Sequence, residues 1–178
     1  MKIEELHSTN EYTNQLAELL IRVVDDGASI GSLPPLDEQL AEAYWKTAVT
    51  PDSVLWIAKQ NGRIAGSVQL HLCTKQNGRH RAEICKLMTD PAFRRQGVAR
   101  SLMEKAIDRA KQEGRSLLVL DTREKDPSNL LYASLGFAEV GRIPAYAESA
   151  DGGFDTSVFY YKNCDEAQKK ALRSGAPF

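Results

Sequence analysis

The chain has 178 residues, 42% of them hydrophobic, which is enough for one compact domain whose core needs neither a metal nor a disulfide. Lysine and arginine total 23 against 24 acidic residues, a formal charge of −1, so no overall field attracts nucleic acid or an anionic membrane. Three widely spaced cysteines (Cys73, Cys85 and Cys164), with no apolar leader or membrane-length run, predict a cytoplasmic protein.

The first half of the chain predicts a strand, two amphipathic helices and an antiparallel meander. Apolar residues at helical spacing indicate the helices, and a loop rich in glycine and proline, residues 27 to 35, separates them. Asn61-Gly62 is typical of a tight hairpin turn. The expected ranges are a strand over 2–6, helices over 9–23 and 37–49, and strands over 54–58, 64–72 and 81–88.

The second half predicts two further helices and three further strands. A helix from Ala99 ends at Gly114, and the apolar run that follows is typical of a central strand covered on both faces. Asp126-Pro127 has the pattern of a helix start and Gly136 that of a helix end. The remaining expected ranges are strands over 116–121, 137–143 and 154–162; residues 1–164 form the domain and 165–178 a tail or peripheral helix.

The turn that leads into the helix at Ala99 has the composition of an anion site. Backbone N–H groups at a helix N-terminus have no partner in the helix, and the helix dipole is positive there. Gly97 lets a ligand approach without a Cβ in the way, so a pyrophosphate would fit. An ordinary solvated helix start with two surface arginines is the competing interpretation. The motif lacks the Gly-Lys-Ser/Thr of a triphosphate loop and two of the three glycines of a dinucleotide fingerprint.

The order of motifs resembles the GNAT (GCN5-related) N-acetyltransferase superfamily. Residues 94–99 (Arg-Arg-Gln-Gly-Val-Ala) match its Arg/Gln-x-x-Gly-x-Gly/Ala signature, with Ala99 in the last place, and residues 129–137 match its Asn-x-x-Tyr-x-x-x-Gly-Phe helix. Residues 27–31, 120–123, 143–147 and 159–162 are similar to tabtoxin-resistance-type acetyltransferases. These stretches narrow the resemblance without identifying a substrate.

The resemblance implies a mixed α/β fold: a sheet of about seven mostly antiparallel strands with about four helices, in which strands four and five splay apart. It also implies acetyl-CoA as cosubstrate, with pantetheine along the backbone of the fourth strand at Leu87 and Met88. The other residues that it implies for cofactor binding lie at the helix start and on the Asn-x-x-Tyr helix. They are Arg94, Arg95, Gln96, Gly97, Val98, Ala99, Arg100, Asn129 and Tyr132.

Acetyl transfer to an amine needs a base, because an amine with a pKa near about 10 is mostly protonated at neutral pH. Two carboxylates are candidates: Glu83 on the fourth strand and Asp121 at the end of the fifth. Glu83 could instead be a solvent-facing or salt-bridged strand residue, and Arg123 could neutralise Asp121. The sequence leaves open which of the two is the base.

Tyr132 matches the family's proton donor to the departing thiolate, whose conjugate acid has a pKa of about 8.5. A core tyrosine is the competing interpretation. Cys85 lacks a histidine placed by sequence to activate it as a nucleophile, and His7, His71 and His80 show no ligand spacing, so no metal is predicted.

The acceptor pocket is expected between the loop at 28–35 and the segment 146–154. Tyr44, Trp45 and Tyr146 are candidates to line it, although core packing is the favoured interpretation of Tyr44 and Trp45. The predicted function is N-acetylation of a small-molecule amine, such as an amino-acid-like compound, toxin or antibiotic. A protein or peptide acetyltransferase and a CoA-binding sensor without turnover are the alternatives, and a homodimer is an assembly that the sequence allows.

Overall fold

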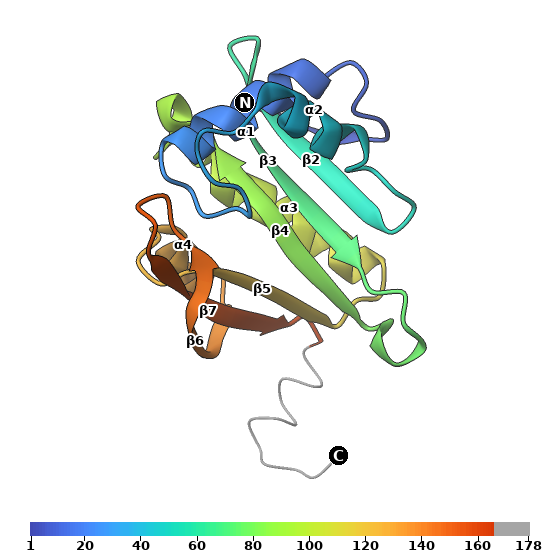
Figure 1. Ribbon diagram of the computed structural model, residues 1–178. Helices are drawn as coiled ribbons and strands as arrows, with labels where there is room; N and C mark the ends of the chain where they lie inside the picture. Colours follow the sequence, from blue (N-terminus) through green and yellow to red (C-terminus); the bar gives the residue numbers. More distant parts are fainter. Residues whose placement is uncertain (166–178) are drawn as a thin grey trace.

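The computed structural model describes residues 1 to 165 and shows one mixed sheet with helices on both faces (Figure 1). The strand order is β1-β2-β3-β4-β5-β7-β6, and β4 and β5 are parallel whereas every other neighbouring pair is antiparallel. The strands are β1 (Lys2–Leu6), β2 (Ser53–Gln60), β3 (Arg63–Leu72), β4 (Arg81–Thr89), β5 (Leu117–Arg123), β6 (Ala138–Glu148) and β7 (Phe154–Asn163). The expected seven-stranded mixed sheet is confirmed.

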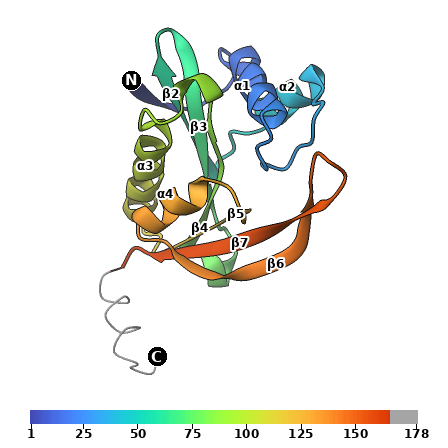
Figure 2. The same cartoon turned by 90° about the vertical axis from the view of Figure 1, so that its left-hand side faces the viewer.

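Four α-helices lie within the described residues, two on each face of the sheet (Figure 2). They are α1 (Thr13–Asp25), α2 (Glu38–Lys46), α3 (Val98–Gln112) and α4 (Ser128–Ser134), with short 3-10 turns η1 (Gln76–Gly78) and η2 (Pro91–Phe93). The apolar stripe of α1, which includes Leu16, Leu19 and Leu20, is fully buried with α2 against one face. None of these helices has the length and apolar composition needed to cross a membrane.

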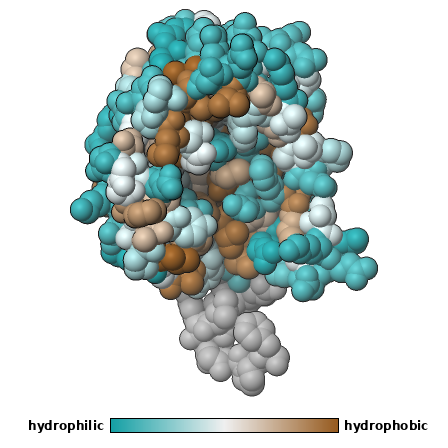
Figure 3. All heavy atoms as spheres, viewed as in Figure 1, coloured by the Kyte–Doolittle hydropathy of each residue, from teal (hydrophilic) through white to brown (hydrophobic). Residues whose placement is uncertain are grey.

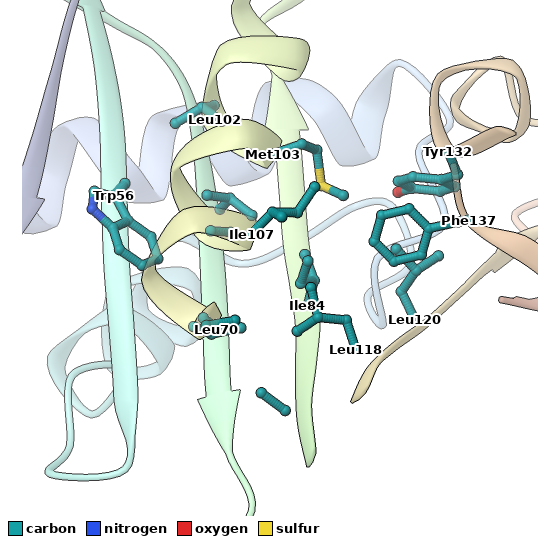
Figure 4. Packing of buried hydrophobic residues seen from close by; sticks show 14 of the residues in the cluster. Trp56, Leu70, Ile84, Leu102, Met103, Ile107, Leu118, Leu120, Tyr132 and Phe137 are labelled. Atoms are coloured by element: carbon teal, nitrogen blue, oxygen red, sulfur yellow. The ribbon is translucent and has the colours of Figure 1, made fainter. Parts of the chain in front are cut away.

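A second apolar cluster fills the other face, between the sheet and the pair α3 and α4 (Figure 4). Leu102, Met103 and Ala106 of α3 are completely buried there, which confirms the helical periodicity that the sequence shows. Tyr132 and Phe137 extend the cluster to the α4 end of the sheet. This layer therefore fixes α3 and α4 relative to the sheet, and with them both candidate cofactor motifs.

The sheet is interrupted between β4 and β5. The two strands pair at only three positions, the last of them Glu83 with Val119, and β4 then continues to Thr89 without a β5 partner. Figure 1 shows the strands close where β4 begins and separating toward α4. The predicted splay of strands four and five is thus confirmed, and the space that it opens is called the gap below.

Strand β6 ends five residues later than expected, because it continues through Pro144 to Glu148. Proline lacks an N–H, and a strand tolerates it at an edge or a bulge. Strand β6 is at the edge of the sheet, and its register with β7 shifts between Ile143 and Ala147, so both conditions are met. The expected strand end at Ile143 was wrong for this reason. The predicted tail or peripheral helix at 165–178 lies outside the described residues except for Asp165.

Candidate active site

The turn from β4 into α3 is anchored by Asp90, whose side chain is 2% exposed. Its Oδ1 accepts a hydrogen bond from the Ala92 backbone at 2.9 Å, and its Oδ2 lies 3.0 Å from Arg22 Nε and 3.5 Å from an Arg63 nitrogen. Phe93 is buried next to it. These contacts set the path of the chain before the exposed stretch that follows.

The exposed stretch presents a run of free backbone N–H groups. Gly97 caps α3 with φ of 82° and no side-chain cap, and Arg95 also has a positive φ, of 61°. Within residues 1 to 165, the N–H groups of residues 95 to 100 donate to no protein acceptor. A Cβ built on Gly97 has no atom within 4 Å, so the space in front of these amides is open. The arrangement fits an anion with several oxygens, such as a diphosphate.

Three polar side chains of this stretch contact residues elsewhere in the chain. Arg95 is exposed and makes no hydrogen bond or ion pair within the described chain. Val98 is buried and Ala99 is half-buried, and together they hold the first turn of α3 against the core. The other contacts are Arg94 with Asp26, Gln96 with Gln60 at 2.8 Å, and Arg100 with Ser134 at 2.8 Å.

Strand β4, which leads into this loop, carries a bulge at Lys86, whose φ is 49°. The register with β3 shifts here, and Leu87 and Met88 follow at the unpaired edge of β4. The side chains of Leu87 and Met88 pack into the apolar clusters on opposite faces, which leaves their backbone at the gap. An extended ligand with amide groups could pair with this edge as an additional strand does.

Tyr132 reaches the gap from α4. It is 6% exposed and packs against Phe137 and Tyr160, with ring centroids 6.1 Å and 5.8 Å away. Figure 4 shows its hydroxyl pointing from α4 toward β4. Burial raises the pKa of the Tyr132 hydroxyl, the charges of Asp126 and Asp121 add to the rise, and a hydrogen bond with Ser128 opposes it. Tyr132 is therefore a core residue that keeps its proton at neutral and moderately alkaline pH.

Asn129 holds α4 in place through contacts within the protein. Its Nδ2 lies 2.9 Å from the Arg123 carbonyl and 2.7 Å from the Asp126 carbonyl, and its Oδ1 accepts a hydrogen bond from the Tyr160 hydroxyl at 2.8 Å. These bonds engage both ends of the amide. Asn129 thus positions the turn before α4, one helical turn away from Tyr132.

The two candidate bases lie on the same face of the sheet, Glu83 on β4 and Asp121 on β5. Glu83 and Asp121 are both exposed, and neither has an ion pair or hydrogen-bonded side-chain partner in the described chain. Burial raises the pKa of the Cys85 thiol to about 12, and the charges of Glu83 and Asp121 contribute to that rise while Lys86 opposes it. Both carboxylates therefore lie within electrostatic range of Cys85. The Asp121 charge also acts on Tyr132, so it is the carboxylate near both sides of the gap.

The competing interpretation, in which Arg123 neutralises Asp121, is wrong, because Arg123 has other partners. Its guanidinium lies 3.5 Å from Asp155 and 4.0 Å from Asp126, and donates to the Gly27 carbonyl at 2.9 Å. Asp121 remains exposed to solvent at the mouth of the gap.

A groove of about 360 Å³ lies between the α1–α2 connection and the β6–β7 hairpin. Leu33 and Pro34 form one wall, and residues 148 to 154 form the other, with Phe154 67% exposed. Figure 2 shows the two segments facing one another on the side away from α3, and Figure 3 shows a hollow over the gap with hydrophobic side chains on its rim. This is the region in which the sequence predicts the acceptor.

The aromatic candidates for the pocket separate into two kinds. Trp45 is fully buried, which agrees with core packing. Tyr44 is half-buried beneath Lys86 and donates from its hydroxyl to Gln69 at 2.5 Å. Tyr146 is 51% exposed and stands edge-on to Phe159, at a centroid distance of 5.2 Å.

In the part of the chain that the structure describes, no group of histidine, cysteine or carboxylate side chains is arranged to hold a metal.

Comparison with known proteins identifies the family. Residues 20–137 match the model of the acetyltransferase (GNAT) family. The chain belongs to this family. It is 33% identical over 104 residues to an uncharacterized N-acetyltransferase of Azospirillum brasilense, covering 57% of this chain and 62% of that protein. It is 30% identical over 100 residues to the [ribosomal protein bS18]-alanine N-acetyltransferase of Escherichia coli K12, covering 56% and 64%.

A solved structure shares the GNAT fold of this chain. The structure of an acetyltransferase from Salmonella typhimurium with its cofactor acetyl-CoA has a TM-score of 0.77 and 18% identity, and covers 93% of this chain and 96% of that one. At this identity the likeness concerns the fold alone. The chain spans slightly less than two thirds of the length of the two curated relatives described above.

Sequence reasoning missed the roles of Asp90 and Lys86. The Asp90-Pro91 pair directly after a strand is a capping pattern and could have indicated the anchor. No such signal exists for Lys86, because its bulge and its partners are formed by residues far away in the sequence.

Proposed function

We propose that this GNAT-family protein transfers an acetyl group from acetyl-CoA to the primary amine of a small molecule, by direct attack in a ternary complex. The observation that carries the proposal is the run of unpartnered amides at residues 95 to 100, in front of open space at Gly97. This run fits the diphosphate of coenzyme A, and the unpaired backbone at Leu87 and Met88 fits its pantetheine amides. Acetyl-CoA supplies the activated acetyl group as a thioester.

The residues around the gap have the properties that the transfer needs. Asp121, with Glu83 as the other candidate, is an exposed carboxylate that can take a proton from the incoming amine directly or through water. Tyr132 keeps its proton because its pKa is raised, and its hydroxyl points toward β4. We assign it as the proton donor to the departing thiolate. The groove beside the gap would hold the body of the acceptor.

Acetylation of a protein or peptide is the second candidate. A relative that is 30% identical over 56% of this chain is an alanine N-acetyltransferase of ribosomal protein bS18, and an open groove could admit a chain terminus as well as a small amine. The narrower resemblance to tabtoxin-resistance-type enzymes stays a prediction. A cytoplasmic location is part of the proposal, and the wide spacing of the three cysteines in the sequence supports it. A homodimer is also part of the proposal, and a measurement of mass in solution tests it.

Calorimetry with coenzyme A, followed by thiol-release assays, tests the proposal. We expect heat of association with coenzyme A and release of free thiol from acetyl-CoA in the presence of a small amine. Release only with peptides would favour the second candidate, and binding without release from any amine would indicate a sensor. If coenzyme A does not bind, the proposal is wrong.

A further inference from the structure

Two cations, one from each edge of the gap, reach the same connection between helices. Lys86 of β4 donates from Nζ to the Ile30 carbonyl, and Arg123 of β5 donates from Nη2 to the Gly27 carbonyl at 2.9 Å. Residues 26 to 37, called the α1–α2 loop below, thus cross the mouth of the gap and are tied to both strands. The same loop supplies Leu33 and Pro34 to the groove.

Lys86 is held in this contact by its surroundings. Its Nζ lies 4.9 Å from the centre of the Tyr44 ring, and it forms no ion pair with a carboxylate among the residues that the structure describes. A Cβ added to Gly31 would come within 3.3 Å of Nζ, so the loop passes very close to the ammonium. A half-buried ammonium needs acceptors in place of water, and the Ile30 carbonyl supplies one.

Arg123 connects the loop to the opposite wall of the groove. Its guanidinium binds the Gly27 carbonyl on one side and lies 3.5 Å from Asp155 of β7 on the other. Asp155 follows Phe154, which lines the groove. Because a guanidinium is planar and presents its donors in a fixed geometry, it sets the separation of the two groups that it bridges.

We propose that Lys86 and Arg123 are positioning residues that hold the α1–α2 loop over the gap and thereby set the width of the acceptor groove. The proposal rests on the proposed function, since it takes the groove as the acceptor site. Neither residue needs to touch the reacting atoms. Their loss should therefore weaken binding of the acceptor and leave the chemical step and the binding of coenzyme A unchanged.

The test compares Lys86→Met and Arg123→Met with a matched control. Arg109→Met is suitable because the Arg109 side chain is 30% exposed, as that of Arg123 is, and binds Glu5 and Glu113 instead of the α1–α2 loop. Hydrogen–deuterium exchange of peptides covering residues 26 to 37 measures how often the α1–α2 loop opens. Thiol release is measured with three probe amines: spermidine, L-lysine and a peptide with an N-terminal alanine. The assay gives KM and kcat for each amine that the protein acetylates.

In both test variants we expect exchange in the loop to rise about tenfold and KM for the amine to rise about tenfold, with kcat within about a factor of two. Arg109→Met should change neither quantity, and Arg123→Lys should recover part of the loss. Unchanged exchange in the loop would overturn the proposal. Faster exchange with unchanged KM would overturn its link to the acceptor, and a fall in kcat alone would assign the cations to the chemical step.

Failure of the proposed function has a different signature. In that case the wild-type protein gives no heat with coenzyme A or releases no thiol with any of the three amines. The exchange measurement still decides whether the two cations hold the loop, because it needs neither ligand.

Discussion

The loop before α3 and the groove across the gap differ in how the chain builds them. The loop is a short contiguous run whose ligand-facing groups are backbone amides, held by Asp90 and by the conformation of Gly97. The groove combines the α1–α2 loop, both strands of the gap and the β6–β7 hairpin, and it is shaped by side chains. Substitutions in the loop that keep its conformation should leave its amides in place, whereas a substitution in the groove changes its shape. A fixed cosubstrate suits the first construction and a particular acceptor suits the second.

The strongest test of the region between the two is Tyr132→Phe. The ring stays in its contacts with Phe137 and Tyr160, so the fold and the affinity for coenzyme A should be retained. Loss of the proton donor should lower kcat for thiol release about 10³-fold. Tyr160→Phe is the control, because it removes a neighbouring hydroxyl bound to Asn129. Thiol release by Tyr132→Phe at the wild-type rate would show that the hydroxyl is not the acid.

The second test separates the two carboxylates. Because the Asp121 charge acts on both Cys85 and Tyr132, we expect Asp121→Asn to lower kcat/KM about 10²-fold and Glu83→Gln to have a smaller effect. Both substitutions keep the size of an exposed side chain. Thiol-release assays over a range of amine concentrations give kcat/KM for both variants. The reverse order of effects would make Glu83 the base.

The third test compares two glycines at the two ends of α3. Gly97 and Gly114 have φ of 82° and 69°, and an added Cβ has no neighbour within 4 Å at either site. Alanine should therefore cost about 1–2 kcal/mol of folding free energy at both positions through backbone strain alone. Only Gly97→Ala should raise the Kd of coenzyme A, by about tenfold, as measured by calorimetry. An equal change in Kd for Gly114→Ala would mean that the loop before α3 is not the binding site.

The smallest expected effect on activity comes from alkylation with iodoacetamide at pH 8. The pKa of Cys85 is raised to about 12, so a fraction of only about 10⁻⁴ is thiolate at this pH. The pKa of Cys73 is lowered, chiefly by a hydrogen bond from the Lys75 backbone. Mass spectrometry should find Cys73 modified well before Cys85, with thiol release preserved. Rapid labelling of Cys85 with loss of activity would restore it as a candidate nucleophile.

The two regions also differ in what their sequence could reveal. The helix start at Gly97 and the Tyr132 helix follow from local signals: an apolar period, a glycine, and capping residues. The number of strands and the splay of strands four and five followed from the family resemblance, whereas the strand order was not predicted. The contact of Lys86 with the Ile30 carbonyl could not be predicted, because it depends on a bulge with positive φ at a lysine and on a carbonyl 56 residues away. Whether Asp121 would pair with Arg123 was equally undecidable, since Asp155 competes for the same guanidinium from β7.

The three paired positions between β4 and β5 also have a mechanical meaning. With so few paired positions, few backbone hydrogen bonds join the β1–β4 half of the sheet to the β5–β7 half. A ligand lying along the free edge of β4 would add interactions that hold these two halves of the sheet together. The melting temperature of the protein should then rise with the concentration of this ligand, because the ligand binds only the folded state.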